Sequence, residues 1–303
     1  MQNQLQTLFE ARKNELFFYS PYNFFREIDA QTQINSGILP KLEAFAQAKD
    51  HQIIEIEIEK QTHLFFVQFL AWDTDFFKFP TYKLFAVLYD HQNFDILKQA
   101  IKQFLEKQTN KYLFIEIPSE DVFLMQALSS QGFKLTETRY TYFRNCQNLP
   151  TERFAVRKAD LSDIDSLRKI ASEQRNNFDR FHADPFFSRQ IADDFLAKYI
   201  ENSVKGYADL VLIPDLAQVS AFAAMAFVKE KWHQISVGKI ILTASGVKGW
   251  HYNLVSECLY HIQNQGLNYA VMVTQSTNRA VIRNCEKLGF SLGACSHVLS
   301  LAN

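Results

Sequence analysis

The sequence lacks the features that mark membrane-spanning, secreted or nucleic-acid-binding chains. No apolar run approaches the roughly 20 residues that a membrane span needs, and the opening residues MQNQLQTLFEARKNEL contain no apolar signal core. The net charge is −1, the pI is about 6.7, and no basic stripe is interleaved with aromatic residues. We therefore expect a cytoplasmic protein with no membrane partner and no nucleic-acid partner.

Cysteine pairs of the kind that build disulfide frameworks or zinc sites are also missing. Cys146, Cys258, Cys285 and Cys295 form no C-x-x-C pair and no metal-ligand spacing with the 8 histidines. The sequence therefore predicts no metal site.

The chain is long enough for two domains, and each half can bury a core of its own. Residues 1–50 predict an aromatic-rich N-terminal helical extension. From residue 51 the alternation of IIEIEIE predicts a strand, and two strands follow on either side of an aspartate-bearing turn. Helices at 94–107 and 120–131, with a strand at 112–117, complete an αβ unit.

A polar stretch around Pro150 predicts the boundary between a small domain, 51–148, and a second domain, 153–303. The two domains share a pattern. Residues 127–144 and 284–301 each run from a helix through Gly-Phe into an alternating strand. This repetition indicates two related half-sheets.

A strand, a polar elbow and a helix are predicted within residues 268–290. Val271 and Val273 alternate as in a strand, Asn278 or a neighbouring hydroxyl residue can cap the helix, and Gly289 suits the position after its end. The helix carries the order Asn278-x-Ala280-x5-Glu286-Lys287-Leu288-Gly289-Phe290. This order resembles the closing helix of the GNAT N-acyltransferase superfamily, usually written N-x-x-A-x-x-x-Y-x-K-x-G-F.

The resemblance implies a fold and a ligand. The fold class is α/β with a mixed sheet, in which a C-terminal GNAT fold over 153–303 follows a smaller half-GNAT-like αβ domain. The implied element order of the C-terminal part is β-α-α-β-β-β-α-β-α-β. In this family the strand before the closing helix splays from its neighbour, and acyl-CoA lies in the opening.

The loop that binds the diphosphate of CoA in this family departs here from its usual pattern, Q/R-x-x-G-x-G/A. Gly249 matches, but the first residue is Gly246 and the last is His251, which either crowds the diphosphate or donates a hydrogen bond to it. A glycine-rich turn with no CoA role is the alternative. The CoA contacts that the resemblance implies are Ile241, Leu242, Thr243, Val247, Lys248, Gly249, Trp250, His251, Tyr252 and Asn278, the last of which is also a plain helix cap.

The position of the general acid departs most from the family pattern. Cys285 stands where many family members carry a tyrosine that protonates the leaving thiolate. A thiol can donate a proton, but it is shorter than a phenol and is often a buried apolar group. Tyr252, His251 or a water are the other candidates.

Two further segments narrow the resemblance to dTDP-fucosamine acetyltransferase-like enzymes, which acylate a nucleotide-linked amino sugar. LAWDTDFFKFP at 70–80 resembles their L-x-W-D-S-x-F-F-G motif, with Lys78 in place of the glycine. The segment 180–209 resembles their RFH-x-DP segment through Arg180, His182, Asp184, Asn202, Ser203 and Gly206.

The resemblance implies substrate contacts from Asp73, Asp75, Arg180, His182, Asp184, Asn202 and Gln275. Arg180 suits a phosphate, an aspartate suits hydroxyls or an ammonium, and His182 suits a base. Structural roles are the alternatives. The aspartates at 73 and 75 can cap a turn, Arg180 and Asp184 can pair, and His182 can be a satisfied loop histidine.

We therefore expect an N-acyltransferase that moves an acetyl or short acyl group from acyl-CoA to the amine of an amino-deoxysugar nucleotide by direct attack. A catalytically silent GNAT module is the alternative from another class. A third possibility keeps catalysis but takes a protein or peptide amine. The aromatic segment 17–25 would suit a homodimer or an interdomain seam.

Overall fold

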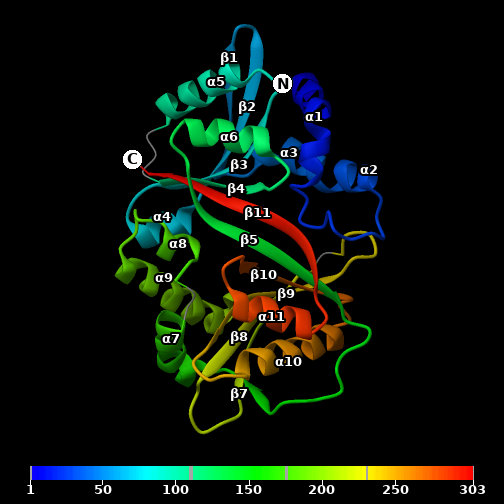
Figure 1. Cartoon of the computed structure of the whole chain (residues 1–303), viewed down its shortest axis with the longest axis vertical. Coiled ribbons are helices and arrows are strands. Elements are labelled where there is room, and N and C mark those ends of the chain that lie inside the picture. Colours follow the sequence, from blue (N-terminus) through cyan, green and yellow to red (C-terminus); the bar gives the residue numbers. More distant parts are fainter. Residues whose placement is uncertain (1, 109–111, 175–176, 230, 303) are drawn as a thin grey trace. The chain divides into compact units, whose positions relative to one another are not determined.

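The computed structural model describes residues 2–108, 112–174, 177–229 and 231–302 (Figure 1). Contacts divide the chain into two compact units. Unit 1 comprises Met1–Thr138 and Ala294–Asn303, and unit 2 comprises Arg139–Gly293. The helical extension thus belongs to the same unit as the first αβ segment. The domain ranges expected from the sequence stay a prediction.

Among the described residues of unit 1, the strands β1-β2-β3-β4-β11 are neighbours in that order, with β3 parallel to β4 and the other pairs antiparallel. Its elements are α1 (Gln2–Phe17), α2 (Ala30–Gln33), η1 (Ile34–Ile38), α3 (Leu39–Glu43), η2 (Phe45–Gln47), β1 (His51–Ile58), β2 (Gln61–Phe69), α4 (Ala71–Phe77), β3 (Thr81–Leu88), α5 (Phe94–Lys107), β4 (Tyr112–Pro118), α6 (Val122–Ser130), the start of β5 (Lys134–Asn145) and most of β11 (Ser291–Ala302).

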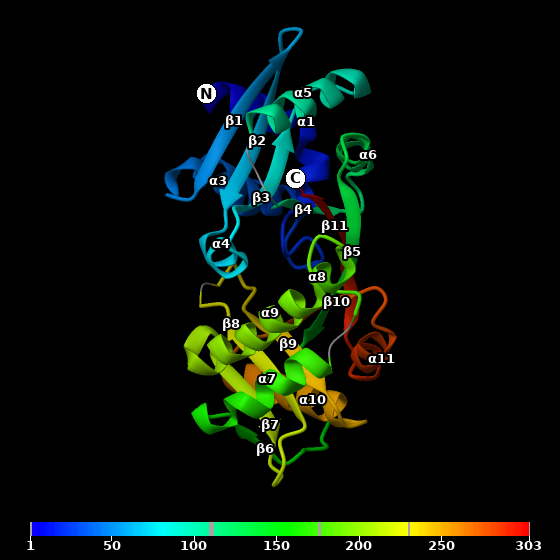
Figure 2. The ribbon, with the colours of Figure 1, turned by 90° about the vertical axis from the view of Figure 1, so that its left-hand side faces the viewer.

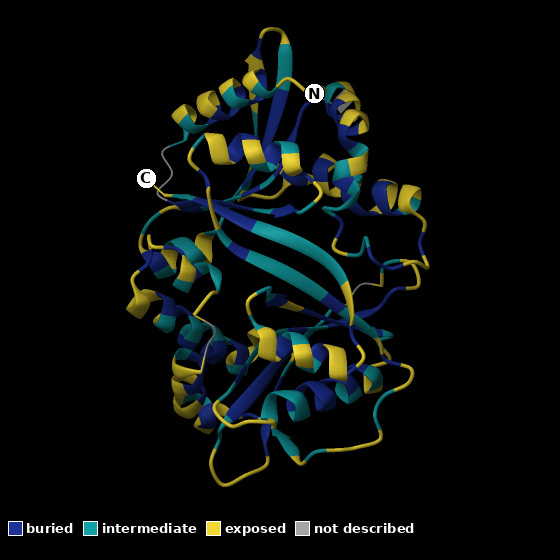
Figure 3. Ribbon diagram, viewed as in Figure 1, coloured by how far each residue is buried: buried dark blue, intermediate teal, exposed yellow. Residues whose placement is uncertain are grey.

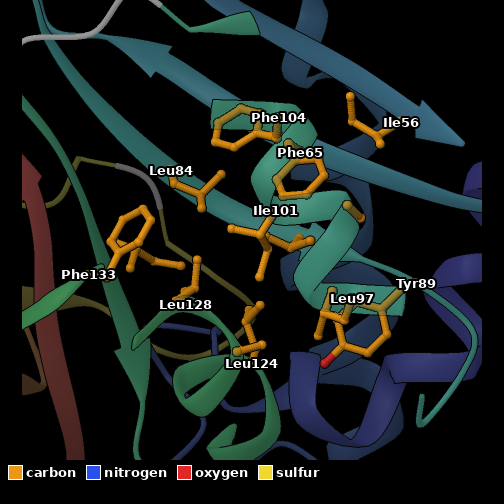
Figure 4. Packing of buried hydrophobic residues seen from close by; sticks show 14 of the residues in the cluster. Ile56, Phe65, Leu84, Tyr89, Leu97, Ile101, Phe104, Leu124, Leu128 and Phe133 are labelled. Atoms are coloured by element: carbon orange, nitrogen blue, oxygen red, sulfur yellow. The ribbon is translucent and has the colours of Figure 1, made fainter. Parts of the chain in front are cut away.

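Side chains from α5 and α6 pack on the strands of unit 1 and form its main core (Figure 4). Phe65 of β2 and Phe104 of α5 stack with ring centroids 4.3 Å apart. The apolar face of α5 recurs with helical spacing, which is why its observed bounds coincide with the predicted ones. The extension packs through α1 on a second cluster. Phe24 and Phe25 are buried, so they do not supply the exposed aromatic surface expected of segment 17–25.

The aspartate-bearing turn predicted between two strands is a helix. Residues Ala71–Phe77 form α4, with Asp73 in its first turn. Lys78 follows at the C-cap with φ 63° and ψ 25°, a left-handed conformation. The motif has glycine at this position because glycine adopts that conformation without a steric penalty.

Unit 2 contains six strands in the order β5-β10-β9-β8-β7-β6 among its described residues, with β9 parallel to β10. Its elements are the end of β5, β6 (Val156–Lys158), η3 (Leu161–Asp163), α7 (Ile164–Glu173), α8 (Arg180–Ala183), α9 (Arg189–Asn202), η4 (Ser203–Tyr207), β7 (Leu210–Pro214), β8 (Ala221–Phe227), β9 (Val237–Ser245), α10 (Trp250–Asn264), β10 (Tyr269–Gln275), α11 (Arg279–Lys287) and the start of β11. The predicted order of elements is present, with the short α8 added where a loop was expected.

Two apolar cores lie on opposite faces of the unit 2 strands. Phe222 and Ala224 of β8 pack with α7 and α9, whereas Ala221 and Ala223 pack with α10 and α11. This alternation is the period of two expected of a strand that is buried on both faces. Figures 2 and 3 show the helices on either side of the strands and the buried β8 between them.

The repeated Gly-Phe pattern ends each αβ run in the same way. Gly132 and Gly289 have φ values of 95° and 71°, and each joins a helix to a long strand. The strand β5 that follows α6 pairs with β10 of unit 2. The strand β11 that follows α11 pairs with β4 of unit 1. Each αβ run therefore supplies its last strand to the sheet of the other unit.

Candidate acyl-CoA site

The strands β9 and β10 diverge within unit 2. They pair in parallel from Val237–Tyr269 to Ile240–Met272, and beyond that pair their mutual pairing ends. Both strands continue: β9 remains paired with β8 as far as Ser245, and β10 with β5 as far as Gln275. Each strand is thus held by its outer neighbour while the gap between the two opens.

A β-bulge lies where the divergence begins. Ala224 and Met225 of β8 pair with Leu242 and Ile240, so Ile241 is the extra residue in β9. A bulge bends a strand and increases its twist. It therefore gives a local reason for β9 to turn away from β10 after Ile240.

A cavity of about 500 Å³ occupies the opening. Its lining comes from β9, β10, the start of α11 and the helices on both faces: Ala171, Gln174, Phe178, Asp179, Leu196, Phe222, Ile240, Ile241, Leu242, Thr243, Ala244, Ser245, His251, Met272, Val273, Thr274, Gln275, Thr277, Asn278, Arg279, Ala280, Val281 and Asn284. Leu196 and Phe222 belong to the α7–α9 face, and Met272 and Val281 to the α10–α11 face. Two reactants can therefore meet here from opposite faces.

The loop between β9 and α10 has the properties of an anion cradle. Gly249, the N-cap of α10, has φ 97°, and a Cβ built there meets no atom within 4 Å. Among the described residues no side chain caps α10, and although the Trp250 N–H donates to Val247 O at 3.4 Å, the N–H groups of His251 and Tyr252 are available to a ligand. Val247 and Lys248 are exposed beside them. These features fit a diphosphate, although the loop lacks the arginine or glutamine of the family pattern.

His251 joins three elements at the edge of the cavity. Its Nδ1 accepts a hydrogen bond from Asn284 Nδ2 at 2.9 Å, so its Nε2 carries the proton and donates to Thr243 Oγ1 at 3.2 Å. Burial lowers the pKa of His251 to about 4. The imidazole is therefore neutral at physiological pH, and it is bound to the protein through both ring nitrogens.

Cys285 lies in the core behind the cavity. Its side chain is fully buried, and its Sγ lies 4.0 Å from Met272 Sδ. Burial raises the pKa of this thiol to about 12. An ordinary thiolate, with a pKa of roughly 8.5, is too weak a base to take that proton readily.

Tyr252 and Trp250 lie in the first turn of α10 and are half-buried. The ring of Tyr252 packs edge-on against Phe154 with centroids 6.3 Å apart. Neither residue belongs to the described lining of the cavity.

Asn278 and Gln275 both line the cavity. Asn278 also caps α11, because its side-chain oxygen accepts a hydrogen bond from the Val281 N–H at 3.3 Å. The two interpretations of Asn278 are thus compatible.

The segment resembling RFH-x-DP forms α8 and the turn after it. Arg180 lies over the Phe181 ring, and the buried Asp184 accepts a hydrogen bond from the Phe186 N–H at 3.0 Å. The side chain of His182 is 3% exposed and lies between the carboxylates of Asp179 and Asp193. It is outside the cavity lining. Asn202 ends α9 and is half-buried.

Asp73 and Asp75 lie in α4 of unit 1, and the remaining predicted substrate contacts lie in unit 2. Asp75 is exposed and pairs with Lys78 Nζ at 3.0 Å.

Three features of the site were not predicted from the sequence. The bulge at Ile241 has no sequence marker within an apolar strand. Asn284 stands one residue before the expected general acid and bonds His251 instead. Asp179 precedes the RFH motif as the N-cap of α8, and its cap position was the available signal.

Within the described ranges no helix combines the length and apolarity needed to cross a membrane. The same residues contain no cluster of three or more histidine, cysteine or acidic side chains suited to a metal ion.

Sequence comparison leaves the family open. No protein-family model matches the chain, and no curated protein matches it significantly.

Solved structures resemble the chain over most of its length. A functionally unknown conserved protein from Staphylococcus epidermidis aligns with 86% of this chain and 97% of its own at 12% identity, with a TM-score of 0.53. A tandem GNAT protein from the clavulanic acid biosynthesis pathway aligns with 98% of this chain and 95% of its own at 9% identity, with a TM-score of 0.50.

A GCN5-related N-acetyltransferase from Sphaerobacter thermophilus aligns with 78% of this chain and 76% of its own at 9% identity, with a TM-score of 0.50. At such identities the likeness concerns the fold alone. The chain has a mixed α/β fold of the GNAT type, which confirms the expected fold class.

Proposed function

We propose that this chain is a CoA-dependent N-acyltransferase that moves an acetyl or other short acyl group to a primary amine in the cleft between β9 and β10. The observation that carries the proposal is the end of strand pairing at Ile240–Met272. Beyond that pair the facing edges of the two strands no longer bond each other, so their main-chain N–H groups would be available to a ligand in the cavity. Such fixed donors stabilise the oxygen of a thioester carbonyl as charge develops on it.

Different residues of the chain would bind different parts of the acyl-CoA cosubstrate. Main-chain groups of Ile241 to Thr243 would meet the thioester end, Asn278 the pantetheine, and the uncapped start of α10 at Gly249 the diphosphate. Lys248 is exposed beside that helix start and would add a positive charge.

Proton transfer to the leaving thiolate is assigned to the reacting amine or to water. Cys285 is buried with a raised pKa, and Tyr252 is outside the described lining. A direct attack with no acyl-enzyme agrees with this arrangement, because the lining includes no cysteine and no lysine among the described residues.

The finer proposal for the acceptor is an amino-deoxysugar nucleotide, for surface polysaccharide synthesis in the cytoplasm. Its support is the sequence resemblance of the segments 70–80 and 180–209. A protein or peptide amine is the alternative acceptor within the same chemistry.

A catalytically silent GNAT module is the second candidate, and specific observations favour it. Gly246 and His251 depart from the CoA-binding pattern, and the expected general acid is replaced by a buried thiol. Such a module would bind a ligand or partner in the same cleft without turnover.

Product analysis separates the two candidates. The protein is incubated with acetyl-CoA and, separately, with a dTDP-linked 4-amino-4,6-dideoxyhexose, glucosamine, phenethylamine and a peptide with a free N-terminus, and amides are sought by mass spectrometry. An acetylated amine whose formation depends on the protein supports the enzyme, and the preferred amine identifies the acceptor class. Binding of acetyl-CoA with no amide from any amine would make the silent module the better account.

A further inference from the structure

Asp179 is the one carboxylate among the described residues that line the cavity. It lies with Phe178, Leu196 and Phe222 on the α7–α9 side, and the other charged lining residue is Arg279, at the start of α11. We propose that Asp179 binds the ammonium group of the acceptor and takes the proton that the amine must lose before it attacks. This inference rests on the proposed acyltransferase function.

The Asp179 carboxylate is fixed through both oxygens. Its Oδ1 accepts hydrogen bonds from the N–H groups of Phe181 and His182, at 3.0 and 3.2 Å. Its Oδ2 accepts from His182 Nδ1 at 2.5 Å. The Asp179 side chain is 15% exposed, so a ligand in the cavity can reach it while these hydrogen bonds fix its orientation. A charged group held in one orientation loses little entropy when a ligand binds.

His182 is a positioning residue in this arrangement rather than the base itself. Its side chain is 3% exposed, and its Nε2 lies 3.0 Å from Asp193 Oδ1 on α9. Each ring nitrogen of His182 thus lies within hydrogen-bond distance of one carboxylate oxygen, so the imidazole joins Asp193 to Asp179. Asp193 therefore orients His182, and His182 holds the carboxylate of Asp179 toward the cavity.

The surroundings of Asp179 favour an ion pair with an amine. Leu196 and Phe222 belong to the apolar core beneath the α7–α9 face, and Phe178 adds an aromatic surface at the cavity edge. Apolar walls lower the local dielectric constant, so an ammonium beside the carboxylate is held more strongly than in water. A primary amine that is cationic in solution is thus the acceptor this side of the cavity suits.

The proton balance of the transfer is simple. The acceptor enters as R–NH3+ and gives one proton to Asp179, which frees the nitrogen lone pair. The nitrogen bonds to the thioester carbonyl carbon, the C–S bond breaks, and its electron pair stays on sulfur. The second proton lost from nitrogen neutralises that thiolate. Asp179 then returns its proton to water, and the products are an amide, a thiol and one proton. General bases of this kind contribute about 10²- to 10⁴-fold in rate.

The first test compares Asp179→Asn with Asp160→Asn. Asp160 is a matched control because it also caps a helix start through its side chain, outside the cavity. Phenethylamine and glucosamine are titrated by calorimetry into protein saturated with CoA. We expect at least one amine to bind wild-type protein, a loss of about tenfold or more in Asp179→Asn, as for a charged hydrogen bond, and no loss in Asp160→Asn.

Equal amine affinity in Asp179→Asn and wild-type protein would overturn the inference. So would a wild-type protein that binds acetyl-CoA but neither amine. Failure of wild-type protein to bind acetyl-CoA at all would instead remove the proposed function on which the inference rests.

The second test concerns the positioning role. Asp193→Asn is compared with Asp194→Asn, its exposed neighbour on α9, whose carboxylate accepts from Gln190 at 3.0 Å. With the preferred amine, Asp193→Asn should lower kcat about tenfold while the Kd for acetyl-CoA stays constant, and Asp194→Asn should change neither. A lower melting temperature in Asp193→Asn with unchanged kcat would reduce the contact to a structural one and contradict the assignment.

Discussion

Ile240 of β9 and Met272 of β10 are the last residue pair that joins these two strands. The bulge at Ile241 follows at once, and both strands then run on beside their outer neighbours. The cavity therefore results from strand geometry rather than from a missing side chain. A site built in this way depends on main-chain groups, which explains why few residue identities mark it in the sequence.

Close packing behind β9 gives the first prediction. Gly238 lies against α10, and a Cβ built on it would overlap the side chain of Ile262. We expect Gly238→Ala to lower the free energy of unfolding by about 1–3 kcal/mol, because the helix must shift away from the strand. Chemical denaturation measures the change. Gly238→Ala combined with Ile262→Val should recover part of the loss, and an unaltered stability of the single variant would contradict the packing.

The left-handed residue after α4 gives the second prediction. Lys78 has φ 63°, a conformation that costs a side-chain-bearing residue about 1–2 kcal/mol. We expect Lys78→Gly to stabilise unit 1 by roughly 0.5–1 kcal/mol after the larger unfolded-state entropy of glycine is subtracted. The lost ion pair to Asp75 is exposed and contributes little.

Lys98 provides the control for this experiment. It pairs with Asp95 at the same i,i+3 spacing, but inside the regular helix α5. Lys98→Gly should destabilise by about 1 kcal/mol. Destabilisation by both substitutions would show that the strain at Lys78 is absent.

The hydrogen bond between Asn284 and His251 gives the third prediction. Burial sets the pKa of His251 to about 4, and the Asn284 amide donates to its Nδ1. A carboxylate at this position would attract the imidazolium, so Asn284→Asp should raise the pKa of His251 by roughly 1–3 pH units. Titration of the His251 Hε1 signal by NMR measures the shift. An unchanged titration midpoint would mean that the two side chains do not meet.

A histidine pair in unit 1 predicts that the free energy of unfolding depends on pH. His63 Nε2 lies 2.7 Å from His91 Nε2, and burial, followed by repulsion from His91, lowers the pKa of His63 to about 4. The unfolded chain, with a histidine pKa of about 6.5, therefore binds this proton first as the pH falls. Stability that is fully present above pH ~6.5 should decrease as the pH falls toward ~4, by roughly 2 kcal/mol.

Denaturant unfolding at pH 7 and pH 4.5 tests this dependence. His63→Gln should reduce the difference in unfolding free energy between the two pH values. His233→Asn, at an exposed histidine in a loop, should leave it as in wild-type protein. An equal pH dependence in all three proteins would assign the acid sensitivity to other groups.

The sequence predicted the elements whose signals are local. The helix at 94–107 has a regular apolar period and a clear Asn93 cap, and the Gly-Phe ends of α6 and α11 have the left-handed glycine that the pattern requires. Elements whose signal is weak within their own residues were predicted wrongly. The sequence predicts a turn at α4 because this helix has few residues and stands between two strongly alternating strands.

The site was predictable only where it follows a motif. The resemblance pointed to Ile241, Leu242, Thr243, Gln275 and Asn278, and these residues lie in the lining of the cavity, while their roles in binding stay a prediction. The burial of Cys285 and the bonding of His182 to two carboxylates depend on packing between α11, β10, α8 and α9. Spacing along one chain does not carry that information.

The most direct test of the cleft is acetyl-CoA binding measured by calorimetry in wild-type protein, Gly249→Arg and Gly266→Arg. Gly249 and Gly266 stand at the two ends of α10, both have positive φ, and a side chain at either would meet no atom nearby. Both substitutions therefore place a side chain at a positive φ in open space, and only the first blocks the helix start beside the opened strands. We predict saturable binding in wild-type protein and Gly266→Arg, and none in Gly249→Arg. Equal affinity in all three proteins, or no binding in any of them up to millimolar acetyl-CoA, would contradict an acyl-CoA site between β9 and β10.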